Sequence, residues 1–372
     1  MAGHPLVQLG TLGQSPWLDY ITRDLLVTGE LQRLIAEDGL RGMTTNPTIF
    51  EKAVAGSDRY DADIRALADS RIAPAEIIET LAVADVRAAC DAFLPLYRSS
   101  VGRDGFVSIE VSPALAHDAD GTALEARRLW EAVSRPNVMI KIPGTQAALP
   151  AITRCLSRGI NVNVTLLFSV ARHRQVMEAY FTGLERRRLR REPIAGVASV
   201  ASFFVSRLDT MLDPLLDASR DAAARGLRGT IAIANAMLAY AAFQETFRGP
   251  RWDVLAGEGA GVQRPLWAST STKDPTLPDV YYVEALVAPD TVTTLPPETL
   301  AAYGDHGRPE VRITPHAVVD ARQRLAALAG AGFNLEDVTR TLETEGVQKF
   351  SASFTALSNG VRQKAVALSG AS

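Results

Sequence analysis

Cysteine and long apolar runs are both scarce in this chain of 372 residues. Its only cysteines, Cys90 and Cys155, stand far apart, which excludes a disulfide framework and a zinc site of paired cysteines and suits a reducing compartment. No uninterrupted apolar stretch reaches the length of a membrane span. The first 13 residues lack the basic and apolar segments of a secretion signal, so we expect a cytoplasmic protein without a membrane partner.

A large excess of charge is also missing, since the formal net charge is only −3. A nearly neutral chain has no global attraction for nucleic acid, so we expect no nucleic-acid partner. The strongest local charge cluster, at residues 185–192, has no interleaved aromatic side chains and is typical of a solvated helix end. The five histidines are scattered without the spacing of metal ligands, and we therefore expect no metal site.

Lysine is scarce as well, because it supplies only 5 of the 39 basic residues. One of these, Lys141, stands inside the apolar run at 138–143. A guanidinium stays protonated, whereas a desolvated lysine amine can lose its proton and attack a carbonyl to form a Schiff base. The segment by itself favours a plainer interpretation, in which Lys141 lies at a strand end and its charge reaches solvent. Both interpretations stay open at this point.

The chain alternates short β-like runs with longer helical ones. At 40.0 kDa and 47% hydrophobic residues it can bury a large core. Eight strands alternating with helices predict a parallel sheet, and eight parallel strands also close a TIM barrel, with a doubly wound open sheet as the main alternative. The expected strands cover residues 16–20, 40–45, 106–111, 137–142, 160–167, 194–204, 265–270 and 291–295.

Several local patterns predict where helices begin and end. A helix is expected over residues 75–98, and the capping-box spacing of Thr122 and Glu125 predicts another helix start. Thr145 and Ser169 are further N-cap candidates. The glycine-rich segment 249–261 is typical of a loop, and the tail after Pro315 predicts two or three helices that cover one end of the barrel.

Side-chain alternation along the expected strands separates an apolar face from a polar one. Most of the polar residues lie toward the carboxyl ends of the strands, where barrel active sites are built, and burying them is costly unless they bond each other or a ligand. The apolar set is Val107, Ile109, Val111, Val138, Ile140, Ile142, Val162, Val164 and Leu166, and the polar set is Asp19, Thr44, Thr45, Asn46, Ser108, Glu110, Lys141, Asn161, Asn163, Thr165 and Ser202.

Each polar residue also has a structural explanation that needs no catalysis. Asn46 precedes Pro47 and equally fits a helix N-cap with proline at the first helical position. Asp19 equally fits a cap for the turn that follows it, and Thr165 is an ordinary strand residue. Glu110 needs a partner in the interior, and an ion pair with Lys141 would satisfy a structural role as well as a catalytic one.

The motifs together resemble the transaldolase family, in its long bacterial subgroup, over nearly the full length of the chain. Each motif alone is of moderate specificity, whereas their order along eight expected strands is highly specific. They are Trp17-Leu18-Asp19, Gly42-Met43-Thr44-Thr45-Asn46-Pro47, Ser108-Ile109-Glu110-Val111, Met139-Ile140-Lys141-Ile142-Pro143, Asn163-Val164-Thr165-Leu166-Leu167-Phe168-Ser169, Ala201-Ser202-Phe203-Phe204-Val205-Ser206-Arg207, Arg264-Pro265-Leu266-Trp267-Ala268-Ser269-Thr270 and Thr293-Thr294-Leu295-Pro296.

This resemblance implies a single (β/α)8 barrel domain over residues 1–372, with extra helices that include those at the C-terminus. It implies reversible transfer of a dihydroxyacetone unit from sedoheptulose 7-phosphate to glyceraldehyde 3-phosphate, giving erythrose 4-phosphate and fructose 6-phosphate in the pentose phosphate pathway. Lys141 would form the Schiff base, and no metal or organic cofactor is implied. Glu110, through a water held by Thr165, resembles the acid/base, and Asp19 resembles the base that takes the C4 hydroxyl proton.

The resemblance also implies which residues bind substrate. Asn46, Asn163 and Ser202 resemble the groups that hydrogen-bond the dihydroxyacetone unit. Arg207 matches the arginine that binds the phosphate of the sugar, and Ser269 fits the serine beyond the seventh strand. The basic group that follows this serine is displaced from the usual spacing, so that Lys273, the nearest candidate, is either a phosphate ligand or a solvated loop lysine.

Two alternatives to transaldolase activity stay open. An enzyme similar to fructose 6-phosphate aldolase would release free dihydroxyacetone, but that relative is shorter and has Gln and Tyr where this chain has Glu110 and either Phe203 or Phe204. The second alternative is a catalytically idle barrel that acts as a binding protein. We expect phosphorylated sugar substrates as the partners of the transaldolase, and either a monomer or a homodimer is compatible with the sequence.

Overall fold

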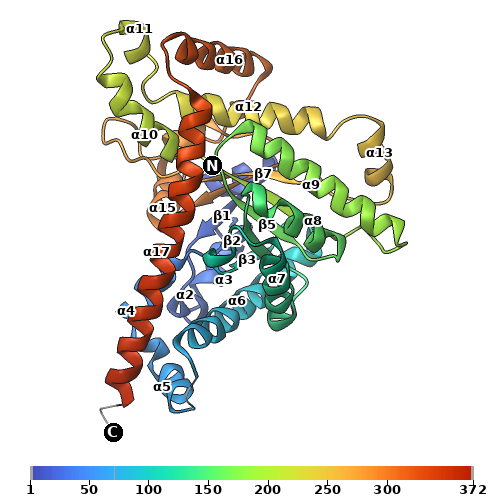
Figure 1. Cartoon of the computed structure of the whole chain (residues 1–372), viewed down its shortest axis with the longest axis vertical. Helices are drawn as coiled ribbons and strands as arrows, with labels where there is room; N and C mark the ends of the chain where they lie inside the picture. The colour runs from blue at the N-terminus through green and yellow to red at the C-terminus, as the bar shows by residue number, and fades with distance from the viewer. Residues whose placement is uncertain (1–2, 71, 370–372) are drawn as a thin grey trace.

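Eight parallel strands form a closed barrel in the computed structural model, which describes residues 3–70 and 72–369. Each strand pairs with the next along the chain, and β8 closes the barrel against β1. Helices surround the strands, as Figure 1 shows, so the predicted TIM barrel is confirmed and the open sheet is wrong. The strands are β1 (Gln14–Asp19), β2 (Gly42–Thr44), β3 (Phe106–Glu110), β4 (Val138–Pro143), β5 (Val162–Leu167), β6 (Ser199–Phe204), β7 (Arg264–Ala268) and β8 (Thr291–Leu295).

Two helices beyond the barrel pattern, α16 and α17, confirm the predicted C-terminal helices. The α-helices are α1 (Pro5–Thr11), α2 (Arg23–Val27), α3 (Glu30–Ala36), α4 (Pro47–Gly56), α5 (Asp61–Asp69), α6 (Pro74–Ser99), α7 (Ala119–Val133), α8 (Leu149–Ser157), α9 (Val170–Leu189), α10 (Ser206–Asp217), α11 (Ala222–Arg225), α12 (Ile231–Thr246), α13 (Pro250–Gly257), α14 (Tyr281–Ala285), α15 (Pro297–His306), α16 (Pro315–Gly330) and α17 (Leu335–Ser369). Short 3-10 helices are η1 (Asp58–Tyr60), η2 (Pro113–Leu115) and η3 (Gln146–Ala148).

The two faces of the strands build two separate apolar cores, as their alternation predicts. Val138, Ile140 and Ile142 of β4 belong to the large core between the barrel and its helices. Met139, on the opposite face of the same strand, packs inside the barrel in a second cluster with Trp17. Lys141 shares the face of Met139 and therefore points into the barrel rather than toward the helix layer.

Leu166 departs from this alternation. Its backbone φ is +61°, a left-handed conformation that a branched side chain rarely adopts, and the register of β5 against β6 shifts between Val164 and Leu167. With this shift Leu166 borders a cavity at the carboxyl ends of the strands while it still packs in the large core, and Leu167 packs in the same core. The prediction that Leu166 faces the helices was therefore incomplete, because the bulge has no mark in the sequence.

Three local predictions were wrong. The expected strand at 194–204 begins only at Ser199, because Gly196 takes a left-handed turn with φ of +84° just before it. The expected capping box fails because α7 begins at Ala119, where Asp118 accepts backbone hydrogen bonds from the first turn. The segment 249–261 is not wholly a loop, since it contains α13.

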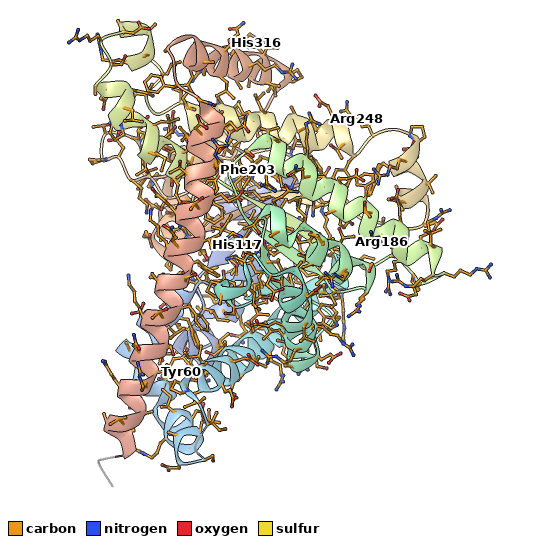
Figure 2. The ribbon with its side chains drawn as sticks, in the orientation of Figure 1. Tyr60, His117, Arg186, Phe203, Arg248 and His316 are labelled. Carbon is orange, nitrogen blue, oxygen red and sulfur yellow. The ribbon has the colours of Figure 1, made fainter. Side chains whose placement is uncertain are left out.

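Other local predictions were confirmed. The helix expected at 75–98 is α6, and the hydroxyls of Thr145 and Ser169 cap η3 and α9 respectively. The charge cluster at 185–192 falls on the outer end of α9 and the turn after it, where Arg186 is exposed (Figure 2). This cluster is a solvated helix end.

The last helix, α17, is 35 residues long and runs along one side of the molecule from α10 to α4 and α5 (Figure 1). Its C-terminal half packs Leu357 and Val361 into a satellite core with Phe50, Tyr60 and neighbouring residues of α5 and α6. The satellite core fixes the C-terminal half of α17 beside the barrel. The residues of α17 nearer its start pass over the carboxyl ends of the strands.

Candidate active site

A cavity of about 720 Å³ opens at the carboxyl ends of the strands. In a (β/α)8 barrel this end carries the active site. Neighbouring strands contribute one polar side chain after another to its floor, and the loops, α10 and α17 form its walls. The strand residues that line it are Asp19, Thr44, Glu110, Lys141, Thr165, Leu166, Ser202, Phe204, Leu266, Ala268 and Thr294.

The amine of Lys141 lies inside this cavity and its side chain is only 10% exposed. Its Nζ is 2.6 Å from Oε1 of Glu110 and donates a hydrogen bond of 3.0 Å to the carbonyl oxygen of Thr45. Glu110 and Lys141 are direct partners in the register of β3 against β4, which brings the two side chains together. The interpretation of Lys141 as a lysine whose charge reaches bulk solvent is therefore wrong.

Burial raises the pKa of Glu110 to about 7, and the positive charge of Lys141 opposes this rise. A carboxyl group with a pKa near neutrality can both take and return a proton at working pH. The contact between the amine and the carboxylate is direct in this structure. A bridging water held by Thr165, as the family resemblance implies, would need to enter between Glu110 and the reacting carbon rather than between Glu110 and the amine.

Asp19 ends β1 on the same face and also lines the cavity. Burial raises the pKa of this carboxyl, while the charges of Lys141 and Arg207 lower it. Among the described residues, its buried Oδ1 has no hydrogen-bond partner. An acceptor that is desolvated without a partner is costly unless a ligand supplies the hydrogen, so this atom is placed to accept a hydrogen bond from a ligand.

A chain of hydrogen bonds lies beneath the reactive pair. Ser202 donates to Oδ1 of Asn163 at 2.6 Å, and Nδ2 of Asn163 donates to Oγ of Ser108 at 3.0 Å. Ser202 lines the cavity, whereas Asn163 is buried one step below it and does not belong to the lining. Because the Ser202 proton is already committed, its hydroxyl oxygen is left to accept a hydrogen bond from a ligand.

Asn46 both caps a helix and borders the cavity. Its side chain accepts a hydrogen bond from the backbone N–H of Thr48 and caps α4, and it also lines the cavity. Thr165 lies on β5 opposite Pro143 in the register with β4, and it lines the cavity beside Lys141. Both residues therefore border the space that a molecule bound to the amine of Lys141 would occupy.

The residues expected to bind phosphate gather on a different wall of the cavity. Arg207, in the first turn of α10, lies with its guanidinium 5.1 Å from the ring centre of Phe204, and burial lowers its pKa. Ser269 shares a hydrogen bond of 3.0 Å with Ser206, and Lys273 donates to Ser271 at 2.7 Å. All five of these polar side chains line the cavity, so Lys273 does face it despite its displaced spacing.

Sequence reasoning missed the contribution of α4 and α17. Thr48 of α4 lines the cavity, as do six residues of α17: Leu342, Glu345, Gly346, Lys349, Phe350 and Ser353. Their spacing of three and four residues marks one face of a helix, and that spacing was readable. Which end of the barrel the face covers was not readable, because it depends on long-range packing.

Residues 3–70 and 72–369 lack two kinds of feature. No group of three or more His, Cys, Asp or Glu side chains is placed to hold a metal ion in that part of the chain. None of the helices described there combines the length and apolarity that crossing a membrane requires.

Comparison with known proteins places this geometry in a family. Residues 16–361 match the family model described as transaldolase/fructose-6-phosphate aldolase. A transaldolase of Frankia alni is 49% identical over 362 residues, which cover 97% of each chain. A transaldolase of Acidothermus cellulolyticus is 50% identical over 357 residues, 96% of each chain, and one of Thermobifida fusca is 48% identical over 365 residues, 98% of this chain and 99% of its own.

Proposed function

This chain belongs to the transaldolase family, and on that premise we propose that it transfers a dihydroxyacetone unit between phosphorylated sugars through a Schiff base on Lys141. Relatives of about half identity over nearly the whole chain are transaldolases, so the chain is a transferase of that kind. The observation that carries the proposed mechanism is the 2.6 Å contact between the amine of Lys141 and Glu110 inside the cavity.

The first step of the proposal forms the Schiff base. Lys141 transfers a proton to Glu110, and the neutral amine attacks the C2 carbonyl of the ketose, giving a carbinolamine. Glu110 then returns the proton to the departing hydroxyl, so that water leaves and an iminium remains. The pKa of about 7 for Glu110 supports both halves of this exchange.

The second step breaks the bond between C3 and C4. Asp19 takes the proton of the C4 hydroxyl, the aldehyde product leaves, and the bonding electrons enter the iminium to give an enamine on Lys141. The buried and unpartnered Oδ1 of Asp19 supports this role. The enamine then adds to the aldehyde of the acceptor sugar, and hydrolysis releases the new ketose by the same steps in reverse.

The remaining cavity residues hold the sugar in this proposal. Asn46 and Ser202 bind hydroxyls of the dihydroxyacetone unit, and Thr165 holds the water that Glu110 uses. Asn163 acts from below by holding Ser202, although the resemblance implies direct contact with substrate. Arg207, with Ser269 and Lys273, binds the phosphate at the other end of the sugar.

Two positions in the barrel, those of Glu110 and Phe204, distinguish transfer from simple cleavage in this proposal. Phe204 lines the cavity, whereas Phe203 packs in the outer core against Trp267, so Phe204 stands where the aldolase relative has tyrosine. Without that hydroxyl, and with Glu110 beside the amine, the site favours passing the enamine to an acceptor sugar over releasing it to water.

The assay that tests this function follows fructose 6-phosphate with and without erythrose 4-phosphate. The proposal expects sedoheptulose 7-phosphate and glyceraldehyde 3-phosphate when the acceptor is present, and at most one turnover when it is absent. Equal consumption of fructose 6-phosphate in both reactions would establish an aldolase instead, and no consumption in either would establish an idle barrel.

The proposal extends to the setting of the enzyme. We expect one barrel domain over the whole chain, a cytoplasmic location that suits the two separate buried thiols, and a monomer or homodimer in solution. Gel filtration with light scattering measures the last of these directly.

A further inference from the structure

The C-terminal helix contributes an ion pair to the cavity that the reaction above does not use. Glu345 and Lys349 of α17 both line the cavity, and Oε2 of Glu345 lies 3.1 Å from Nζ of Lys349. Their side chains are 40% and 67% exposed, so both can move without leaving a buried charge. Lys349 and Lys273 are two of only five lysines in the chain, and both border the same cavity.

We propose that Lys349 is a further ligand for the substrate phosphate, supplied by the C-terminal helix, and that it exchanges its contact with Glu345 for the phosphate when substrate binds. This inference rests on the proposed function, because it assumes that the cavity binds phosphorylated sugars. The inference adds a cation from α17 to a phosphate site that Arg207 of α10 forms with Ser269 and Lys273, which follow β7.

The balance of charge in the cavity supports this role. Apart from the Lys141–Glu110 pair, the acidic residues Asp19, Glu298 and Glu345 line it. The cations available to a phosphate carrying nearly two negative charges are Arg207, Lys273 and Lys349. An exposed pair such as Glu345 with Lys349 contributes little to stability. A phosphate carries nearly two negative charges against the single charge of the carboxylate, so exchange of partners is favourable.

The helix that carries Lys349 is held against the cavity on both sides of it. Upstream, Glu343 lies 3.5 Å from Nε of Arg172 on α9, and downstream the hydroxyls of Ser353 and Thr48 are 2.7 Å apart. Between these contacts, Gly346 lets the helix approach Leu166, whose Cδ2 would lie 3.1 Å from an added Cβ. Lys349 therefore extends from a fixed backbone and not from a free tail.

A flexible cation also suits the range of substrates. The phosphates of a six-carbon and a seven-carbon ketose lie one carbon apart when C2 of each is bound to Lys141. An arginine fork recognises one position well, whereas a lysine is a point charge on a flexible stem that can follow either position. Lys349 and Lys273 would supply this tolerance beside Arg207.

The test measures preference for a phosphorylated acceptor. With fructose 6-phosphate as donor, kcat/KM is determined for erythrose 4-phosphate and for erythrose, and their ratio is compared among variants. Because a covalent intermediate separates the two half-reactions, kcat/KM for the acceptor reports the second half-reaction alone. We expect Lys349→Gln to lower the ratio about 10-fold, the size of a charge-assisted hydrogen bond, and Lys349→Arg to restore most of it.

Two further variants sharpen the outcome. Glu345→Gln frees Lys349 and removes a repelling charge, so the ratio is expected to rise. Arg340→Gln is the matched control, because Arg340 is a cation on the same helix with the same 67% exposure, paired with Asp337 and outside the cavity lining; its ratio should equal that of the wild type.

An unchanged ratio in Lys349→Gln, or an equal fall in Arg340→Gln, would overturn the role of Lys349 while leaving the proposed function intact. A wild-type protein that consumes fructose 6-phosphate equally with and without acceptor would instead overturn the proposed function. The two failures are therefore distinguishable in one set of assays.

Discussion

At the residue scale, the cost of the Lys141–Glu110 pair is the strongest argument for its use. Both side chains are 10% exposed or less, and desolvating two charges consumes much of what their attraction returns. A pair that served only stability could be replaced by apolar residues at little loss. Its place at the floor of a solvent-accessible cavity, beside the unpartnered oxygen of Asp19, is explained by chemistry instead.

Replacing Glu110 by Gln removes the group that exchanges a proton with Lys141. We expect kcat/KM for transfer to fall by a factor of about 10² to 10⁴, the usual contribution of a general acid/base. In the wild type, kcat/KM should fall below a pH of about 7 as Glu110 becomes protonated, because its pKa is raised to about 7. This acidic limb should be absent in E110Q, and its persistence at the same pH would exclude Glu110 as its source.

Replacing Asp19 by Asn separates Schiff-base formation from bond cleavage. The amide cannot take the C4 hydroxyl proton, so we expect transfer to fall at least 100-fold while the ketose still condenses with Lys141. Borohydride reduction followed by mass spectrometry should then show an adduct with the mass of the whole fructose 6-phosphate. An adduct of dihydroxyacetone mass in D19N would show that another group breaks the bond.

Strand alternation predicted most of the site at this scale. Neighbouring side chains along a strand point to opposite faces, so the alternation of polar and apolar residues in the sequence predicted that Lys141, Glu110 and Asp19 face the cavity. The depth of Asn163 could not be read in this way, since alternation gives the face but not the level within the barrel. The inward turn of Leu166 depends on a left-handed backbone at a residue that does not normally adopt one.

At the element scale, long-range packing decides what local patterns leave open. The face of α17 that carries Lys349 has ordinary helical spacing. It lines the active site because contacts far apart in the sequence hold the helix there, among them Leu357 and Val361 in the satellite core around Phe50. The start of α7 shows the same limit, because Asp118 and Thr122 are both good capping residues and the local sequence does not choose between them.

The pairing of β1 with β2 depends on a glycine. Gly42 lies opposite Trp17 in the register, and a Cβ at this position would collide with the indole ring inside the barrel. We expect Gly42→Ala to destabilise the protein by about 1–3 kcal/mol, as overpacking of a tight core does. The matched control is Gly257→Ala at the end of α13, where an added Cβ meets no heavy atom within 4 Å. Urea unfolding should show a lower midpoint for the first variant only, and equal midpoints would contradict this account.

At the scale of the whole molecule, buried titratable groups outside the cavity tie stability to pH. His173 is fully buried between α9 and the barrel, 5.9 Å from the ring of Phe203, and burial lowers its pKa to about 4. Between pH 6.5 and 4 the unfolded chain therefore binds a proton that the folded protein does not, so this group's contribution to stability falls as pH falls. Glu110 and Asp209 act in the opposite sense, because burial raises the pKa of each to about 7.

Replacing His173 by Leu isolates its contribution from the other groups. We expect the stability of H173L relative to the wild type to increase by about 2 kcal/mol between pH 7 and pH 5, since the shifted proton affinity no longer favours unfolding. Urea unfolding of both proteins at the two pH values measures this difference. A difference between the proteins that stays constant with pH would show that His173 is not the group responsible.

The order of the elements was the easiest feature to predict for the whole molecule. Eight strands separated by helices leave few topologies, since crossover connections between parallel strands are nearly always right-handed. The closure of β8 on β1 and the reach of α17 across the cavity join residues hundreds of positions apart. No local pattern carries that information. The family resemblance supplied the closure of the barrel, whereas the residues of α17 that line the cavity were not predicted.

The most direct test of the central claim is to trap the intermediate on Lys141. The protein is incubated with fructose 6-phosphate and sodium borohydride, and the modified peptide is mapped by mass spectrometry, with Lys141→Arg as the control that keeps the charge but cannot form an imine. The account predicts a reduced adduct of dihydroxyacetone mass on Lys141 in the wild type and none in the control. No adduct, or an adduct on Lys273, would contradict it.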